Sequence, residues 1–298
     1  MSDAYFVSRL RSEFEKRRAA ETARFPEAES VRVDMHCHDK NSDVPDERMA
    51  RILRWPETWV DTESVRACIE KNGSRPLTMT NHNNARTCFE LLDQGVDQLV
   101  GAEFTCDMPD FNLKLHVLTY GFTPAEEYEL NERRKNLYRF LEYARERGLV
   151  TVLAHPLFFY YSGALPSLRY LERLMLLFDN VEVWNGQRDA WQNLLSLRFV
   201  ESMNEESIRA IAKREQFSPH AFCESPYKKR MTGGSDCHMA LFAGESGTRF
   251  HIPNLDERRR HAPLSALVLE AFKQGDFSWF GAFSSEAKLT AALLDFFC

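Results

Sequence analysis

Two histidines one residue apart, preceded by an acidic residue, close a short apolar run near the start of the chain. Residues 31–33 lead into Asp34, His36 and His38. Side chains alternate between the two faces of an extended strand, so these three side chains point to the same side. Imidazole and carboxylate donors together suit Zn, Mn or Fe. The sequence therefore predicts half of a metal site, which needs further ligands from other parts of the chain.

Other histidines and one aspartate follow further segments that have the pattern of strands. In folds that alternate strand and helix, the carboxyl-terminal ends of parallel strands meet at one rim, where active sites form. A single such histidine is more often a hydrogen-bonded structural residue, but several at one rim indicate a metal centre. The residues concerned are His82 at the end of 76–82, His155 in 149–156, and Asp236 and His238 after a strand that begins near 231.

Helical and extended patterns alternate about seven times after residue 30. This alternation predicts an α/β fold of parallel strands, either a βα barrel or a doubly wound sheet. Residues 3–24 form an amphipathic helix outside the domain, closed by Pro26. No low-complexity linker divides the chain, which predicts one domain over 31–298 after a helical extension over 1–30. The other predicted helices are 62–71, 85–94, 124–147, 188–214, 256–274 and a last one near the C-terminus, and the other predicted strands are 98–105, 112–120 and 180–186.

A long segment, residues 39–60, connects the first strand to the helix at 62–71. Connections of this length at an active-site face are often functional. A surface insertion packed by its own aromatic residues is an equally good interpretation.

Composition narrows the class of protein. The 298 residues are 44% hydrophobic and 28% charged, the proportions of an ordinary globular protein. The formal net charge of -6 gives no overall attraction for nucleic acid, although a local basic groove stays open. Seven cysteines without a CxxC pair predict reduced thiols. No apolar run approaches the roughly 20 residues of a membrane span, and the first residues lack the order of a signal peptide, so a cytoplasmic protein without a membrane partner is expected.

Several short motifs resemble, in the same order, those of the PHP (polymerase and histidinol phosphatase) family. The resemblance runs from about residue 31 to residue 283. Several motifs in the right order are a specific signal, whereas any one alone is weak. The motifs are Asp34-Met-His-Cys-His38, Ser42-Asp43, Thr80-Asn-His82, Gly101-Ala-Glu103, His116-Val-Leu-Thr-Tyr-Gly121, Ala154-His-Pro156 and Gly234-Ser-Asp-Cys-His238.

The resemblance implies a distorted (β/α)7 barrel with three divalent metal ions at the carboxyl-terminal rim. Every position where the family has a ligand holds a residue that can bind metal, so a metal-free copy is not expected. By similarity, one metal takes His36, His38, Glu103 and Asp236. A second takes His116 and His155 and shares Glu103, and a third takes Asp43, His82 and His238.

Three positions depart from the family pattern. Asn81 stands where an aspartate is common, Val44 follows Asp43 where glycine is common, and Asp39 stands where threonine is common. Asn81 cannot supply a carboxylate, but its amide can still hydrogen-bond to a neighbouring ligand. Whether Asp39 adds a ligand or rearranges its loop is left open by the sequence.

The expected chemistry is hydrolysis of a phosphoester. A metal-bound water whose pKa falls toward neutrality supplies hydroxide, and paired cations stabilise both oxygens of an in-line displacement at phosphorus. Glu103 and Asp236 are the expected catalytic residues, with Asp236 orienting the nucleophilic water. Asp34 is expected to hold a ligand histidine in its tautomer. Cationic or proton-donating contacts to the substrate are assigned to Lys40, Arg86, Arg188 and His220, each of which is otherwise an ordinary solvated side chain.

The first hypothesis is thus a stand-alone phosphoesterase acting on a small phosphorylated molecule. A nuclease or nucleotide phosphatase is the alternative, because PHP relatives include exonuclease modules, although the acidic balance provides no broad phosphate-binding surface. An amide hydrolase and a noncatalytic, metal-stabilised module are two further alternatives. The sequence does not choose among Zn, Mn and Fe, and it does not determine the oligomeric state.

Overall fold

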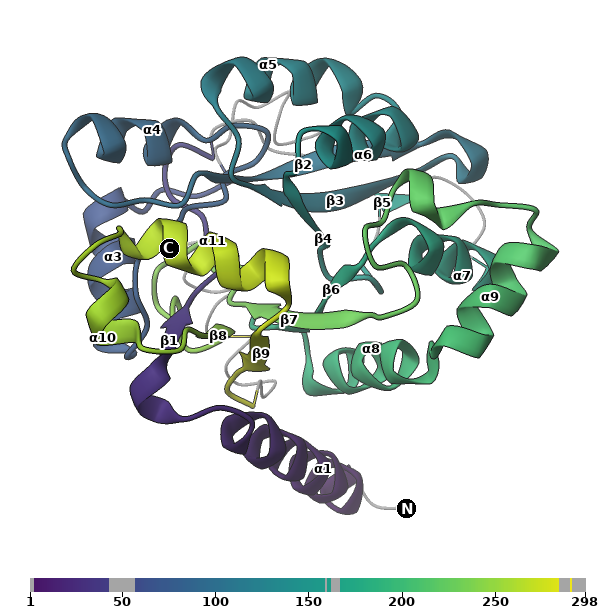
Figure 1. Cartoon of the computed structure of the whole chain (residues 1–298). Helices are drawn as coiled ribbons and strands as arrows, with labels where there is room; N and C mark the ends of the chain where they lie inside the picture. Colours follow the sequence, from purple (N-terminus) through teal and green to yellow (C-terminus); the bar gives the residue numbers. More distant parts are fainter. Residues whose placement is uncertain (1–2, 43–56, 159, 162–166, 284–289, 291–298) are drawn as a thin grey trace.

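The computed structural model describes residues 3–42, 57–158, 160–161, 167–283 and 290, and within these the chain is a mixed α/β fold with two sheets (Figure 1). The smaller sheet has the order β1-β8-β9, and the larger has the order β2-β3-β4-β6-β7, with β5 paired to β3. The strands are β1 (Ser30–Val33), β2 (Gly101–Met108), β3 (Leu113–Tyr120), β4 (Val150–Leu153), β5 (Tyr160–Tyr161), β6 (Asn180–Asn185), β7 (Arg230–Gly234), β8 (Gly247–His251) and β9 (Phe277–Phe280).

Strand directions are mixed, and the prediction of parallel strands holds only for β4, β6 and β7. The β2–β3 and β3–β4 pairs are antiparallel, as are β1–β8 and β8–β9. The connection from β2 to β3 is a short 3-10 turn, Pro109–Phe111, followed by Asn112 in the left-handed region (φ 50). A parallel neighbour needs a crossover of a dozen or more residues, so this connection permits only a hairpin.

The described residues do not show the predicted (β/α)7 barrel, because their two sheets are not closed into one regular ring. Residues 34–38 and 76–82, both predicted as strands, form no continuous strand. Single bridges, Cys37–Cys237 and His82–Glu103, join them to their neighbours, and a further bridge, Val33–Arg75, lies just before each segment. Side chains take the place of ladder partners here. The Thr80 hydroxyl accepts from the Cys37 N–H, and the Asn81 side chain accepts from the Asp39 N–H.

The helices largely match the predicted ones, but three predicted long helices are each divided. Asn136 and Asn204 accept hydrogen bonds from the N–H groups that follow them, and so begin a new helix inside 124–147 and 188–214. Two consecutive helices return the chain to the end of the sheet where β3 ends, which makes β4 antiparallel to β3. The helices are α1 (Asp3–Ala23), α3 (Thr62–Lys71), α4 (Arg86–Asp93), α5 (Pro124–Arg133), α6 (Leu137–Glu146), α7 (Leu168–Leu177), α8 (Ala190–Ser202), α9 (Glu205–Arg214), α10 (Leu255–Arg258) and α11 (Leu264–Gln274).

Helix α7 was not predicted, and the predicted C-terminal helix lies outside the described residues. Helix α1 lies outside the sheets beside β9 and α8 (Figure 1). It is fixed there by Phe14, whose ring stacks on Trp184 with centroids 4.5 Å apart, while Trp184 stacks on Trp279 at 5.0 Å. No helix in the described part of the chain is long and apolar enough to cross a membrane.

Candidate metal centre

Glu103, on β2, lies at the middle of a group of five histidines. Its side chain is 1% exposed, and four segments deliver the neighbouring imidazoles, with His36 and His38 on the same one. The distances to Glu103 Oε1 are 2.8 Å from His116 Nδ1, 3.2 Å from His36 Nε2 and 3.2 Å from His155 Nε2, and those to Oε2 are 3.3 Å from His38 Nε2 and 3.4 Å from His82 Nε2.

These separations match donors that share a cation. Two atoms bound to one ion at about 2.1 Å lie roughly 3.0 to 3.4 Å apart when the angle between them is about 90 to 110°. His36, His38, Glu103 and Asp236 form one such set, with Asp236 Oδ1 3.3 Å from His36 Nε2 and 3.4 Å from His38 Nε2. The structure therefore brings together the four residues that the resemblance assigns to the first metal.

A second set joins His116 and His155 to the same glutamate. His116 Nδ1 and His155 Nε2 are 3.3 Å apart, and both face Glu103 Oε1. His82 also lies within this region, in a set with Glu103 and His116. The carboxylate is thus placed to bridge two positions, as the resemblance implies.

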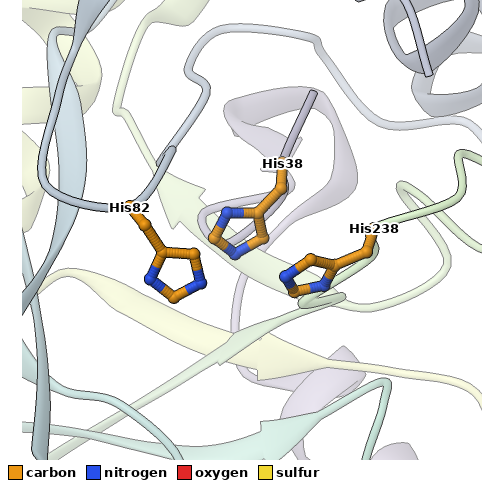
Figure 2. A group of neighbouring side chains, drawn as sticks. All are labelled: His38, His82 and His238. Carbon is orange, nitrogen blue, oxygen red and sulfur yellow. The ribbon is translucent and has the colours of Figure 1, made fainter. Parts of the chain in front are cut away.

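The third set consists of His38, His82 and His238. Figure 2 shows the three rings side by side with His38 between the other two, and the ring centroids are 4.8 Å (His38–His82) and 4.2 Å (His38–His238) apart. The resemblance assigns Asp43 to this metal, and that residue lies outside the described residues. His38 therefore adjoins two of the three predicted metal positions, the first and the third.

The electrostatic field keeps the acids ionised. Burial raises the pKa of Glu103, but His116, His36 and His82 outweigh it and hold this pKa well below its usual range. Burial likewise opposes ionisation of Asp236, yet His36 and the other neighbours hold its pKa well below normal. Ionised carboxylates are the form that binds a cation.

The imidazoles divide into two kinds. Burial, followed by the neighbouring His238, lowers the pKa of His38 well below 6.5, and burial also lowers the pKa of His238. Burial acts in the same sense on His36, but Glu103, Asp236 and Glu182 raise its pKa well above normal in the absence of metal. Neutral imidazole is the ligand form, and a cation in place of the proton satisfies the same carboxylates.

Hydrogen bonds aim the ligand nitrogens. His36 Nδ1 donates to Glu182 Oε1 at 2.9 Å, and His238 Nδ1 donates to the Asp236 carbonyl at 2.9 Å. In both rings the Nε2 lone pair is then left for a metal. Glu182 also accepts from the His155 backbone N–H (3.0 Å) and from Asn185 Nδ2 (2.9 Å), so one carboxylate orients two predicted ligands.

The buried atoms of the centre fit divalent metals. His36 Nε2, both ring nitrogens of His38 and Glu103 Oε2 are buried and make no hydrogen bond of good geometry. Such atoms are costly unless a partner is present. Carboxylates also outnumber permanently charged cations among the described residues of the centre. The carboxylates are Glu103, Glu182 and Asp236, and the cation is Arg188, which contacts Asp236. Bound metal would satisfy the orphaned atoms and balance the charge.

The backbone is bent sharply where ligands leave their strands. His155 (φ 25) and Asp236 (φ 54) both lie in the left-handed region, which non-glycine residues adopt at a cost of about 1–3 kcal/mol. Gly234, at the end of β7, packs directly against His36 and Glu182. A Cβ atom at this position would clash with the His36 side chain and would lie 2.6 Å from Glu182 Oε1. Only glycine permits this approach of β7 to the first ligand segment.

Two residues near the centre were missed by sequence reasoning, Glu182 and Glu57. Glu182 gave the same signal as Glu103, a single acidic residue within an apolar strand, and could have been found by it. Glu57 follows Trp55-Pro56 in the long connection, and nothing in its sequence neighbourhood singles it out. The Glu57 carboxylate is 3.1 Å from His82 Nε2.

Asp34 and Asp39 both act on the backbone and loops. Asp34 accepts from the N–H groups of Ser235 (2.9 Å), Gly244 (2.7 Å) and His36 (3.2 Å), so it holds β7 and its following loop against the first segment and contacts no ligand ring through these bonds. Burial raises the pKa of Asp34 to about 6 despite these donors. The orienting contact expected of Asp34 is made by Glu182.

The carboxylate of Asp39 is occupied by neighbours of its own. It accepts from Thr62 (2.7 Å), from Thr87 (2.8 Å) and from Asn81 Nδ2 (2.8 Å). Asn81 thus has a hydrogen-bonding role next to His82, as its amide allowed. Asp39 arranges its loop in this way, which answers the question that the sequence left open.

Of the four predicted substrate contacts, the structure brings only Arg188 to the centre. Its Nη2 is 3.2 Å from Asp236 Oδ2, and its guanidinium lies 3.8 Å from the centroid of the Phe158 ring. Lys40 and Arg86 are exposed at the margin. His220, also exposed, lies in a 3-10 turn (Pro219–Ala221) against the ring of Tyr227.

Comparison with known proteins gives structural neighbours only. No protein-family model and no curated protein sequence matches this chain. PsfC from Pseudomonas syringae PB-5123 is 14% identical, with a TM-score of 0.51 over 90% of this chain and 98% of PsfC. A two-domain protein from Bacteroides vulgatus ATCC 8482, containing a predicted PHP-like metal-dependent phosphoesterase, is 14% identical (TM-score 0.44, 90% and 69% covered). The lesion-specific endonuclease EndoQ from Pyrococcus furiosus is 14% identical (TM-score 0.41, 78% and 55% covered).

The likeness to PsfC shows a shared fold along most of both chains. At 14% identity this likeness concerns the fold alone, and the activity has to be argued from the metal centre of this chain.

Proposed function

We propose that this protein is a metal-dependent phosphoesterase that hydrolyses a small phosphorylated substrate at a centre of three divalent metal ions. The observation that carries the proposal is the position of Glu103 among five histidines, with Asp236 beside two of them. Divalent ions held there would lower the pKa of a bound water and neutralise phosphate charge. Zn, Mn and Fe all accept this mixture of imidazole and carboxylate.

The chain's own residues divide the work of that reaction. Glu103 and Asp236 would hold the cations, and Asp236, which also accepts from Asn185 Nδ2 at 3.0 Å, would orient the attacking water. Arg188 adjoins Asp236 and can bind a phosphate oxygen by charge-assisted hydrogen bonds. Glu182 keeps His36 and His155 in position. We further propose that residues 31–298 act as one unit, with residues 1–30 as an extension.

The cellular setting proposed is the cytoplasm. The six cysteines within the described residues are free thiols, and Cys37 and Cys237 are buried beside the ligand segments. Burial raises the pKa of Cys37 well above its ordinary range and that of Cys237 to about 12, so neither is a ready thiolate. Reduced thiols support a reducing compartment.

The test combines elemental analysis with an activity screen. Purified protein is assayed for Zn, Mn and Fe, and then against phosphorylated metabolites and short oligonucleotides with and without added Mn. About three metals per chain with turnover of a monophosphate is the expected result. Turnover confined to oligonucleotides would replace the small substrate by nucleic acid, and fewer than two metals per chain without any hydrolysis would overturn the catalytic proposal.

A further inference from the structure

The three-histidine set has a carboxylate beside it that the motifs do not include. Glu57 Oε2 is 3.1 Å from His82 Nε2, and the Glu57 side chain is 15% exposed. His38 and His238 complete the set (Figure 2). A separation of 3.1 Å is within the roughly 3.0 to 3.4 Å expected for two donors on one cation. Glu57 is therefore at the right distance to share an ion with His82.

The segment that carries Glu57 is attached to the centre. The hydroxyl of Thr58, a residue that is 1% exposed, donates to the backbone carbonyl of His238. Two residues later the carbonyl of Val60 accepts from the Lys40 N–H at 2.8 Å. Residues 57–60 are thus bonded both to the ligand segment after β7 and to the loop after His38. These contacts hold the backbone next to Glu57 against the segments that carry His38 and His238, and the Glu57 side chain itself contacts His82.

The chemistry of the set favours an additional carboxylate. Three imidazoles carry no negative charge, and Glu103 Oε2 is shared with the positions on its other side. The ring nitrogens of His38 are fully buried and make no hydrogen bond of good geometry. Mixed histidine and carboxylate donors are the usual environment of a reactive divalent ion.

We infer that Glu57 is a direct ligand of the cation bound by His38, His82 and His238, so that residues 57–60 belong to the metal centre. This inference rests on the proposed metal-dependent function and names a ligand that the motifs do not contain. A plain hydrogen bond from His82 to Glu57 is the competing role. Glu57→Gln separates the two, because an amide keeps the acceptor but loses the charge that makes a good metal ligand.

The test measures metal content and Zn affinity in the full chain, by elemental analysis and by competition with a fluorescent chelator. Glu63→Gln is the matched control, since Glu63 lies in the first turn of α3 with its side chain 81% exposed. We expect Glu57→Gln to lose one metal per chain, or to bind its weakest-held Zn at least about 10-fold less tightly. Glu63→Gln should equal the wild type. Unchanged content and affinity in a folded Glu57→Gln protein would overturn the inference.

A double substitution tells which ion is affected. If Glu57 and His238 hold the same ion, Glu57→Gln with His238→Asn loses one metal, as each single variant does, whereas loss of two metals contradicts the inference. If Glu57→Gln does not fold by circular dichroism, Glu57→Ala, which also removes the carboxylate, replaces it, and affinity equal to the wild type is then the contradicting result. Phosphoester turnover is recorded on the same wild-type sample. A wild type that binds metal but hydrolyses no phosphoester overturns the proposed function and leaves the Glu57 result intact.

Discussion

Two glutamates of this protein are each surrounded by nitrogen-bearing side chains, yet the two clusters need different things. Glu215, after α9, contacts Arg169 and Arg173 at 2.9 Å and Arg214 at 3.4 Å. Glu103 has five imidazoles around it at 2.8 to 3.4 Å. The distances are alike, and the charges of the partners are not.

The charges of the partners show in which of the two clusters the carboxylate charge is already balanced. Guanidinium groups are always charged, so hydrogen bonds from Arg169 and Arg173 lower the pKa of Glu215 to about 2 and balance it. Imidazoles can be neutral, and around Glu103 they are accompanied by Asp236 and Glu182. A buried group of carboxylates with neutral neighbours is stable only with added positive charge. The histidine cluster therefore takes up positive charge, as protons on rings such as His36 or as metal ions, whereas the arginine cluster is already balanced.

The largest effect is expected from replacing the central glutamate. Glu103→Gln should lower kcat/KM for the phosphorylated substrate by about 100- to 1000-fold, because loss of the shared carboxylate removes several kcal/mol of metal-derived stabilisation. Metal content should fall in parallel. Glu215→Gln is the control and should keep both metal content and turnover. Equal losses in the two variants would remove the distinction between the clusters.

The next largest effect should be the fall in Tm when metal is removed. With metal at about 100 times its dissociation constant, one ion adds about 2.7 kcal/mol to the free energy of unfolding. For a chain of this length that corresponds to a rise in Tm of about 5 °C or more. Dialysis against a chelator should lower Tm by that amount, and added Zn or Mn should restore it in the wild type but not in Glu103→Gln. A Tm that is insensitive to chelator would contradict a metal-filled centre.

A smaller effect is expected from the carboxylate that aims two ligands. Glu182→Gln keeps the size of the side chain but gives His36 Nδ1 a weaker partner, and the change should cost about 10- to 100-fold in metal affinity. Chelator competition measures this directly. The Gln variant should retain more affinity than Glu182→Ala, which removes both hydrogen bonds. Identical metal affinities in the two variants would show that the hydrogen bonds of Glu182 do not orient His36 and His155.

The smallest effect is a dependence of stability on pH at the arginine cluster. The pKa of Glu215 is lower in the folded chain, about 2, than its ordinary value of 4.5. The ionised carboxylate therefore adds stability that is complete above about pH 4.5 and is lost as the pH falls toward 2. Urea unfolding should show the wild type more stable than Glu215→Gln at pH 6 and the gap narrowing at pH 3. A gap that does not change with pH would contradict the fixed-charge description.

Local patterns in the sequence were enough to mark several of the residues that the structure brings together around Glu103. Alternation placed Asp34, His36 and His38 on one side of a segment, and acidic or histidine residues in apolar runs marked Glu103, His116 and His155. These inferences depend on short-range periodicity, which survives without knowledge of neighbouring segments. The positions of α1, α3 and α4 followed from the same kind of evidence.

Tertiary structure decided which segments meet. A short turn at Pro109–Phe111 made β2 and β3 a hairpin, and caps at Asn136 and Asn204 divided helices that periodicity alone predicted as continuous. Contacts between residues far apart in the chain, such as Glu182 with His36, depend on how these elements pack, and a single sequence does not record that packing. The sequence by itself determined the chemical identity and order of the donors, whereas their convergence on Glu103, the orienting role of Glu182 and the nearness of Glu57 were decided by the fold.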